Sequence, residues 1–359
     1  MSSVGRIVTR VFEEQDVPQQ MTAAVNRGAG RLEVEDVAVP PVGERDVLVQ
    51  VELCGVCGSD LHMVLEGWGQ RGSWHGHEWV GRVAAVGGAV TEWRVGDPVV
   101  GGPMARCGAC AMCRSDRPSL CTSRDTPGIG PEQGAFATYK VTPAHELLAM
   151  PDGIDPRAAA LAEPLAVALH GITRSGVQPG QAALVLGAGP IGSLSIAALR
   201  AMGVDDIRCA EPGERRQALA AAVGATRVLH PDDLEVPTIV EPARVIDDPV
   251  DVVLECSGKA AAMEAGLAQL RRAGTLVLVG AGMERPSFDP NRILLNELIV
   301  TGANTYDHDG FERALTLLAS GTLPIEALVE PGVVPLDGLL EAMRGLADGR
   351  LAGKVLVQP

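Results

Sequence analysis

Thiols, imidazoles and carboxylates are concentrated between positions 52 and 78 of the sequence. Cys57 and His77 are the first candidates for a metal site, because Zn²⁺ prefers thiolate sulfur, imidazole nitrogen and carboxylate oxygen. Cys54 is a rival thiol, since Cys54 and Cys57 have the spacing of half a zinc finger. No second pair follows at finger spacing, so the pattern favours a catalytic site with three protein ligands and an open fourth position.

The run CGVCGSDLH at 54–62, followed by GHE at 76–78, resembles the zinc-dependent medium-chain alcohol and polyol dehydrogenases. The resemblance covers about residues 21–359. It implies that Cys57 and His77 bind the catalytic zinc and that Ser59 and His62 relay a proton. Either relay residue alone would be interpreted as a loop residue with local hydrogen bonds, but the combination at these spacings favours the catalytic role.

The third ligand of this site is expected to be a carboxylate, because no cysteine occurs between positions 121 and 209. The run AEPL around Glu163 resembles the polyol and glucose dehydrogenase branch, in which a glutamate lies at the metal directly or through water. Glu163 or Glu78 therefore completes the predicted site, and the resemblance implies that Asp60 supports it from outside the ligand set. Glu163 could instead be an acid at a helix N-terminus, since Pro164 favours a helix start.

A second metal site is predicted from four thiols, Cys107, Cys110, Cys113 and Cys121. Four cysteines at close spacing form the closed ligand set of a structural Zn²⁺, and the resembled family carries a lobe with this spacing. An iron–sulfur cluster is the alternative, but the last gap differs from the ferredoxin pattern.

A nucleotide site is predicted where the apolar run 182–186 leads directly into a G-x-G-x-x-G turn and then a helix-forming segment, 193–202. Glycines at such a turn let the backbone approach a pyrophosphate at a helix N-terminus. The predicted nucleotide contacts are Gly187, Gly189, Pro190, Ile191, Gly192, Glu211, Arg216 and Lys354. Glu211 would accept hydrogen bonds from the ribose hydroxyls, which favours NAD, whereas Arg215 or Arg216 could bind the phosphate of NADP.

The elements that position these sites indicate an α/β protein of two domains, since 359 residues exceed what one core usually supports. Short Val-rich runs between turns predict a mostly-β domain, which the resemblance identifies as GroES-like. Alternating strands and helices after it predict a doubly wound parallel sheet, the Rossmann domain. The expected boundaries are an extension at 1–20, a catalytic domain at 21–165 and 306–359 with the zinc lobe at 107–121, and a nucleotide domain at 166–305.

Composition limits the partners. A net charge of −15 without a basic run argues against nucleic acid and against an anionic membrane surface. No apolar run reaches the roughly 18 residues of a membrane span, no signal peptide is visible, and a cytoplasmic location is expected. The strand expected at 298–302 would form a sheet edge. In the resembled family this edge pairs with the same edge of a second subunit, which implies a homodimer or homotetramer.

The predicted function is reversible, zinc-dependent hydride transfer between an alcohol and NAD, with a secondary alcohol, polyol, sugar or cyclitol as substrate. The alternatives are an NADP-dependent carbonyl reductase of a secondary-metabolite pathway and a non-catalytic binding protein on the same fold. A zinc-free reductase of the superfamily should lack Cys57, His77 and the four-cysteine lobe. Trp68, Trp74 and Trp79 either line a substrate pocket or are packing residues.

Overall fold

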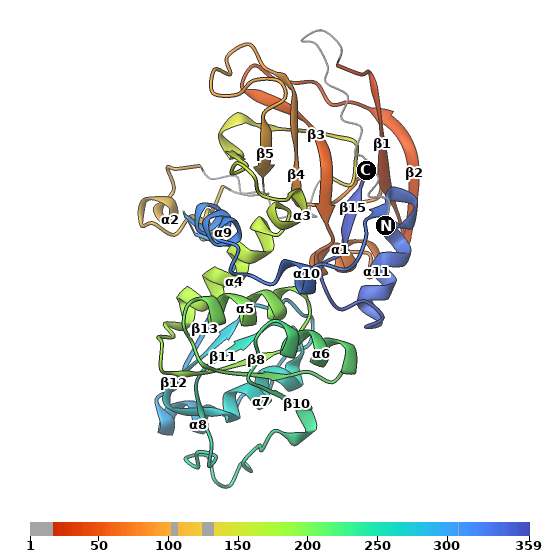
Figure 1. Ribbon diagram of the computed structural model, residues 1–359. Coiled ribbons are helices and arrows are strands. Elements are labelled where there is room, and N and C mark those ends of the chain that lie inside the picture. The colour runs from red at the N-terminus through yellow and green to blue at the C-terminus, as the bar shows by residue number, and fades with distance from the viewer. Residues whose placement is uncertain (1–16, 102–106, 124–132, 308) are drawn as a thin grey trace.

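Two sheets, one in each half of the molecule, organise the chain (Figure 1). The structure is a computed structural model, and it describes residues 17–101, 107–123, 133–307 and 309–359. Helix α4 (Ala162–Ser175) contacts strands of both sheets, and most of its residues are buried. The predicted extension at 1–20 lies largely outside the described residues.

The first half is built on a seven-stranded sheet in the order β14-β15-β3-β4-β5-β7, with β6 beside β3. All of its pairings are antiparallel except β14 with β15, and this half is the mostly-β domain that the sequence predicts. A separate hairpin, β1 with β2, lies outside this sheet. The bounds are β1 Gln20–Gly28, β2 Arg31–Ala38, β3 Asp46–Gly55, β4 Glu78–Val86, β5 Pro98–Gly101, β6 Tyr139–Pro143, β7 Leu147–Ala149, β14 Val334–Pro335 and β15 Leu356–Gln358.

Short helices cover the ends of this sheet and connect it to the second half. The C-terminal helices α9 and α11 are amphipathic, and each buries its apolar side against the rest of the molecule. The bounds are α1 Gly58–Val64, α2 Ala111–Arg114, α3 Pro156–Ala159, α9 Gly310–Ala319, α10 Ile325–Leu328 and α11 Leu339–Ala347. Single 3₁₀ turns lie at Pro118–Leu120, Ala144–Glu146, Pro231–Asp233 and Leu336–Gly338.

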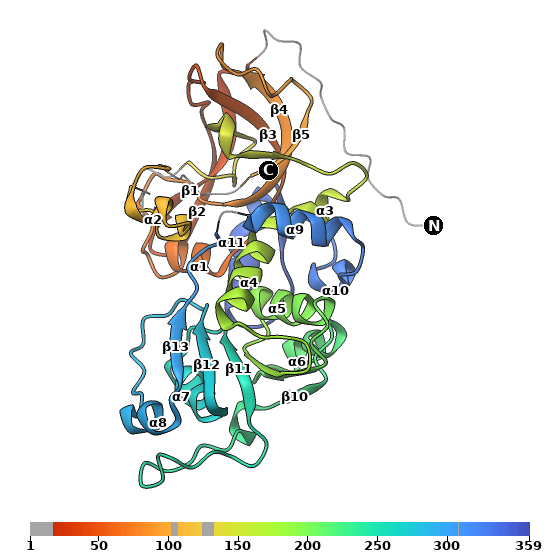
Figure 2. The same cartoon turned by 90° about the vertical axis from the view of Figure 1, so that its left-hand side faces the viewer.

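The second half contains a six-stranded parallel sheet in the order β10-β9-β8-β11-β12-β13. Its strand order reverses between β8 and β11, and this reversal is the switch point at which doubly wound sheets bind ligands. Figure 2 shows β11, β12 and β13 side by side, with β13 at the edge. The bounds are β8 Ala182–Leu186, α5 Pro190–Ala201, β9 Asp206–Ala210, α6 Glu214–Ala222, β10 Arg227–Leu229, β11 Val250–Glu255, α7 Ala260–Ala268, β12 Leu270–Leu278, α8 Pro290–Asn296 and β13 Ile299–Gly302.

One predicted boundary is wrong. The sequence suggests a helix through 259–271, but α7 ends at Ala268 and β12 already begins at Leu270. Leu270 pairs with Val250, and the register then shifts so that Thr275 pairs with Val252. Ala273 lies in this irregular segment with φ of 57°. The early strand start depends on pairing with β11, which the helix-forming residues around it do not reveal. Within the described residues, every helix is too short or too polar to span a bilayer.

Candidate active site

The turn between β3 and α1 positions the first candidate ligand, Cys57. Asp60 fixes this turn, because its Oδ2 accepts a hydrogen bond of 2.8 Å from the Cys57 amide. The other oxygen of Asp60, Oδ1, lies 3.6 Å from Nδ1 of His77. Asp60 is only 1% exposed, so one buried carboxylate connects the two segments that carry the predicted ligands. This is the supporting position that the resemblance implies for it.

The imidazole of His77 lies in a strongly negative environment. Burial opposes its protonation, but the negative charges of Asp60 and Cys57 outweigh this effect and raise the pKa of His77 well above its usual value. A site that stabilises positive charge at this point is suited to a metal cation. The ligand atoms of Cys57, His77 and Glu78 all lie within 4.8 Å of one another, so the residues present fit a zinc ion.

Glu78 approaches this cluster from the buried side. It begins β4 directly opposite Gly55 of β3, and its side chain is 0% exposed. Lys354 balances its charge: Nζ donates to Glu78 Oε1 at 2.7 Å, lies 2.6 Å from Oε2, and donates to the Val56 carbonyl at 2.9 Å. The ammonium group of Lys354 is thus bonded to Glu78 and to the Val56 carbonyl. Its predicted contact with the nucleotide stays a prediction.

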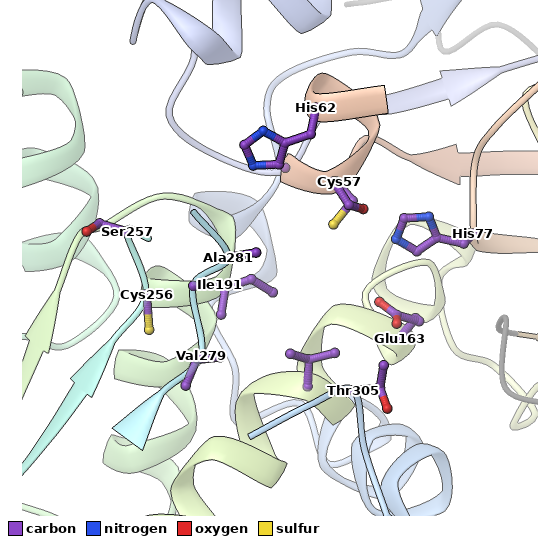
Figure 3. A pocket seen from close by; sticks show the side chains of 14 residues that line it. Cys57, His62, His77, Glu163, Ile191, Cys256, Ser257, Val279, Ala281 and Thr305 are labelled. Carbon is purple, nitrogen blue, oxygen red and sulfur yellow. The ribbon is translucent and has the colours of Figure 1, made fainter. Parts of the chain in front are cut away.

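Glu163 approaches from the open side. It lies in the first turn of α4, as the helix-start interpretation predicts, and it also lines the cavity with Cys57 and His77 (Figure 3). Burial, together with the nearby Glu78 and against the opposing effect of His77, raises the pKa of Glu163 to about 7. The two carboxylates that the sequence left as alternatives therefore lie on different sides of the same site.

The cavity itself, of about 340 Å³, is shared by the two halves of the molecule. Figure 3 shows Cys57, His62 and His77 facing Ile191 and the segment around Cys256. The lining residues from the first half and the linking segments are Cys57, Gly58, Ser59, His62, His77, Glu163, Val167 and Thr305. Those from the second half are Ile191, Cys256, Ser257, Val279, Gly280 and Ala281.

Of the three tryptophans near the metal residues, Trp68 stacks on a predicted site residue and the other two are core residues. Trp68 stacks on His62, with ring centroids 4.6 Å apart and planes 13° from parallel. Trp74 and Trp79 are 7% and 1% exposed and belong to the hydrophobic core. The packing interpretation is therefore correct for these two.

The glycine-rich turn connects β8 to α5 at the switch point. Gly187 has φ of +86°, and a Cβ atom on Gly192 would lie only 1.9 Å from the Gly187 carbonyl oxygen, so no larger residue fits there. Pro190 is the first residue of α5, and Gly189 precedes it as the cap. Ile191 follows and reaches the cavity.

Glu211 immediately follows β9 and lies next to this turn. Its Oε2 accepts a hydrogen bond of 2.8 Å from the Ala188 amide, and its Oε1 accepts one of 2.9 Å from the Gly213 amide. The two arginines beyond it point elsewhere. Arg215 is paired with Glu330 at 3.0 Å, and Arg216 donates to the Leu346 carbonyl at 2.7 Å. Both contacts join α6 to the first half, so each guanidinium already has a partner within the protein.

Comparison with known proteins identifies the family. Residues 43–152 match the alcohol dehydrogenase GroES-like domain, and residues 190–320 match the zinc-binding dehydrogenase domain. Sorbitol dehydrogenase of Bacillus subtilis is 33% identical over 329 residues, which are 87% of this chain and 90% of that protein. The chain belongs to the zinc-dependent medium-chain alcohol and polyol dehydrogenases.

Other members of these dehydrogenases agree with this assignment. D-xylulose reductase A of Aspergillus oryzae is 31% identical over 346 residues, covering 92% of this chain and 95% of that protein. A zinc-binding dehydrogenase from Sinorhizobium meliloti, solved with NADP, has a TM-score of 0.83 at 32% identity and covers 95% of this chain and 100% of its own. The fold is thus a GroES-like domain with a Rossmann domain, and the family's cofactors are zinc and a nicotinamide dinucleotide.

The four-cysteine lobe has the geometry expected of a structural zinc site in a medium-chain dehydrogenase. The sulfurs of Cys107, Cys110, Cys113 and Cys121 lie within 4.8 Å of one another, and those of Cys107 and Cys113 are 4.0 Å apart. A tetrahedral ion with Zn–S bonds of about 2.3 Å needs sulfurs at roughly this separation. Backbone amides of Ala109 and Cys110 donate to the Cys107 sulfur, which stabilises its thiolate form.

Sequence reasoning missed several residues that line the dehydrogenase cavity. Cys256 and Ser257 follow β11, and Val279, Gly280 and Ala281 follow β12. Ligands bind at the carboxyl ends of strands at a switch point. The apolar runs 251–255 and 275–279 predict two strands here, so their ends were a usable signal. Val167 and Thr305 carried no such signal, because their position depends on how α4 and the returning chain pack between the halves.

Proposed function

We propose that this protein oxidises a secondary hydroxyl group of a polyol, sugar or cyclitol with a nicotinamide dinucleotide, and reduces the carbonyl in reverse. The observation that carries the proposal is the shared cavity. It contains Cys57 and His77 on one side and the carboxyl ends of β11 and β12 on the other. A hydride donor and acceptor require this kind of arrangement, with a metal site and a nucleotide site opening into one space.

In this proposal, zinc is held by Cys57 and His77 together with Glu78 or Glu163. Bound zinc would polarise the substrate oxygen, and the bound nicotinamide would accept the hydride. Glu78 lies within the ligand cluster but is paired with Lys354. Glu163 faces the cavity, and the structure gives it no cationic partner of this kind among the described ion pairs. A single thiolate with carboxylate ligands makes a harder site than two thiolates, so the ion should exchange readily.

The chain's own residues would bind the substrate and move its proton. Ser59 and His62 both line the cavity, so a hydroxyl group bound there can pass its proton outward along them. Glu163 adds a polar group on the opposite wall, where it can accept a hydrogen bond from a neighbouring substrate hydroxyl. Val167, Ile191 and Val279 form apolar walls that exclude water from the site of hydride transfer.

The substrate class is supported by the relatives. Those with at least 30% identity include proteins named for sorbitol, D-xylulose, L-threonine and, among solved structures, 2R,3R-butanediol. All of these names denote compounds with a hydroxyl or carbonyl group next to another polar group. The single-thiolate site with Glu163 supports the polyol side of this range.

NAD is proposed as the preferred dinucleotide. The carboxylate of Glu211 lies beside the glycine turn, where it would repel the 2′-phosphate of NADP and accept from the ribose hydroxyls of NAD. NADP is the second candidate, favoured by the NADP bound to the Sinorhizobium meliloti relative.

Assembly and location are part of the proposal. The outer strand β13 has one unpaired edge within the described sheet, and its Ile299 is 55% exposed. This edge supports a homodimer or homotetramer. All eight cysteines are free thiols, as both metal sites require, which supports a reducing, cytoplasmic location.

A panel of alcohols tests the function. Sorbitol, xylitol, 2,3-butanediol, L-threonine and a cyclitol such as myo-inositol are each offered to the zinc-loaded protein with NAD or NADP, and reduced nucleotide is followed by absorbance. We expect turnover of at least one polyol, absent from the Cys57→Ala variant. A zinc-loaded protein that binds dinucleotide but reduces none with any of these alcohols would favour the binding-protein alternative.

A further inference from the structure

His62 is held on two sides by residues of the segment that follows α1. The helix ends at Val64, and the chain then turns back so that the Trp68 amide donates to the His62 carbonyl at 3.2 Å. This return places the indole of Trp68 flat against the imidazole, at 4.6 Å between centroids. Stacking restricts the plane of the imidazole ring.

The second contact of His62 is with Glu66, one helical turn further along. Oε1 of Glu66 lies 2.9 Å from Nδ1 of His62. Nδ1 is a buried atom that makes no aligned hydrogen bond in this structure, whereas the Glu66 side chain is 50% exposed and has room to rotate. Among the described contacts, no other charged group is paired with Nδ1. A rotation of the exposed Glu66 side chain would align its carboxylate with Nδ1 and keep it in contact with solvent.

We propose that Glu66 is a positioning residue that acts through His62 and accepts the proton released when the alcohol is oxidised. The inference rests on the proposed function. As Nε2 of His62 receives the substrate proton by way of Ser59, the Glu66 carboxylate rotates into line with Nδ1, takes the Nδ1 proton and then releases it to water. The balance is one proton in and one out for each hydride transferred, and in the reverse direction Glu66 supplies the proton.

The proposed transfer requires one particular tautomer of the His62 imidazole before substrate binds. Nδ1 must carry the hydrogen and Nε2 must be free to accept, since an ionised carboxylate can only accept. A neutral histidine takes the tautomer that its partner dictates. Glutamine at position 66 can still accept through its amide oxygen, so it keeps the tautomer but cannot take up a proton. Alanine removes both functions.

The first test is spectroscopic and needs no substrate. The zinc-loaded protein is labelled with ¹⁵N in its histidine rings, and the His62 signals are assigned by their loss in His62→Asn. We expect the Nδ1–H tautomer in the wild type and in Glu66→Gln, and the Nε2–H tautomer in Glu66→Ala. A wild-type protein with hydrogen on Nε2, or a tautomer that does not respond to Glu66→Ala, would overturn the proposal.

The second test is kinetic and uses the alcohol with the highest kcat/KM in the panel. In dilute buffer, Glu66→Gln should lower kcat for oxidation by about tenfold, less than the loss of a direct acid or base, with KM unchanged. Added MES buffer, whose hindered amine binds zinc poorly, should restore the rate by accepting the proton. Glu312→Gln, an exposed carboxylate on α9, is the matched control and should behave as the wild type.

The two tests separate the proposal from the function on which it rests. If the wild type oxidises no alcohol, the proposed function fails, while the tautomer experiment still decides whether Glu66 controls His62. If the wild type turns over and Glu66→Gln has the same kcat without any response to MES, the function stands and the role of Glu66 is disproved.

Discussion

At the residue scale, the buried pair of Glu78 and Lys354 joins a stabilising contact to the candidate metal site, because the Lys354 ammonium group balances a carboxylate of that site. Removing one member of a buried pair leaves an uncompensated charge. We therefore expect Lys354→Met to lower the free energy of unfolding by about 3 kcal/mol, measured by urea denaturation. Lys259→Met, at an exposed position, is the control and should change stability little.

A double variant separates charge from packing at this pair. Glu78→Gln combined with Lys354→Met removes both charges and should recover part of the loss, since the uncompensated carboxylate is then absent. If Lys354→Met were as stable as the Lys259 control, Glu78 would not depend on this cation.

The two thiols at the end of β3 are expected to respond differently to substitution. Cys54 is 0% exposed within the core, whereas Cys57 lines the cavity. Cys57→Ala should abolish turnover and loosen the catalytic zinc while leaving the circular dichroism spectrum unchanged. Cys54→Ala should keep its metal and its activity, with a modest loss of stability from the small cavity it creates. An inactive Cys54→Ala and an active Cys57→Ala would reverse the ligand assignment.

At this scale, the candidate site residues that could be predicted from the sequence are those that lie in local motifs. Cys57, Ser59, His62 and His77 could be predicted because their spacing along one short segment is itself the signal. The partnership of Lys354 with Glu78 could not, since 276 residues separate the two. Their meeting depends on β15 pairing with β3, and no local pattern encodes that pairing.

At the scale of elements, we expect the end of β9 and the glycine turn to determine together which nucleotide is preferred. Glu211 bonds to the Ala188 and Gly213 amides, so its charge is fixed beside the ribose region. We expect kcat/KM to favour NAD by roughly tenfold, about 1.4 kcal/mol, and Glu211→Ser to shrink or invert this preference. Steady-state kinetics with both nucleotides provide the measurement.

The arginines of α6 give the matched comparison. Arg216 donates to Leu346 in the other half of the molecule, so Arg216→Ala should leave the NAD preference nearly unchanged. A wild-type protein that prefers NADP, and loses that preference in Arg216→Ala, would show that the guanidinium outweighs the carboxylate.

Most elements could be predicted from hydrophobic pattern and turn residues, and the run 182–186 matches β8 at both ends. The start of β12 could not, because its first residues are strand only through pairing with Val250. The residues that line the cavity after β11 and β12 were also difficult to predict. Their positions follow from sheet order, which the sequence suggests only through the general rule for switch points.

At the scale of the whole molecule, the two metal sites should differ in strength. We expect about two zinc ions per chain by metal analysis, because four thiolates form a closed site and the Cys57 site has an open position. A chelator should remove the catalytic ion first and leave the fold intact. Cys110→Ala should retain about one ion and unfold at a lower temperature, since its lobe loses a ligand.

The measured metal content decides between the zinc and iron–sulfur interpretations of the lobe. Iron with visible charge-transfer absorption would contradict the zinc assignment, as would a preparation with no metal at all. Loss of both ions at the same chelator concentration would contradict the predicted difference in strength.

The pairing of β15 with β3 also determines when, during synthesis, the sheet of the first half can be completed. The Rossmann half, from β8 to β13, is contiguous in the chain. By contrast, β3 pairs with β15, Leu356–Gln358, which is synthesised about 300 residues later. Domains generally fold as units during synthesis. The nucleotide-binding half is thus able to fold while the GroES-like half still has an open sheet edge and Glu78 still lacks its cation. Translation order makes the zinc-bearing half the last to close.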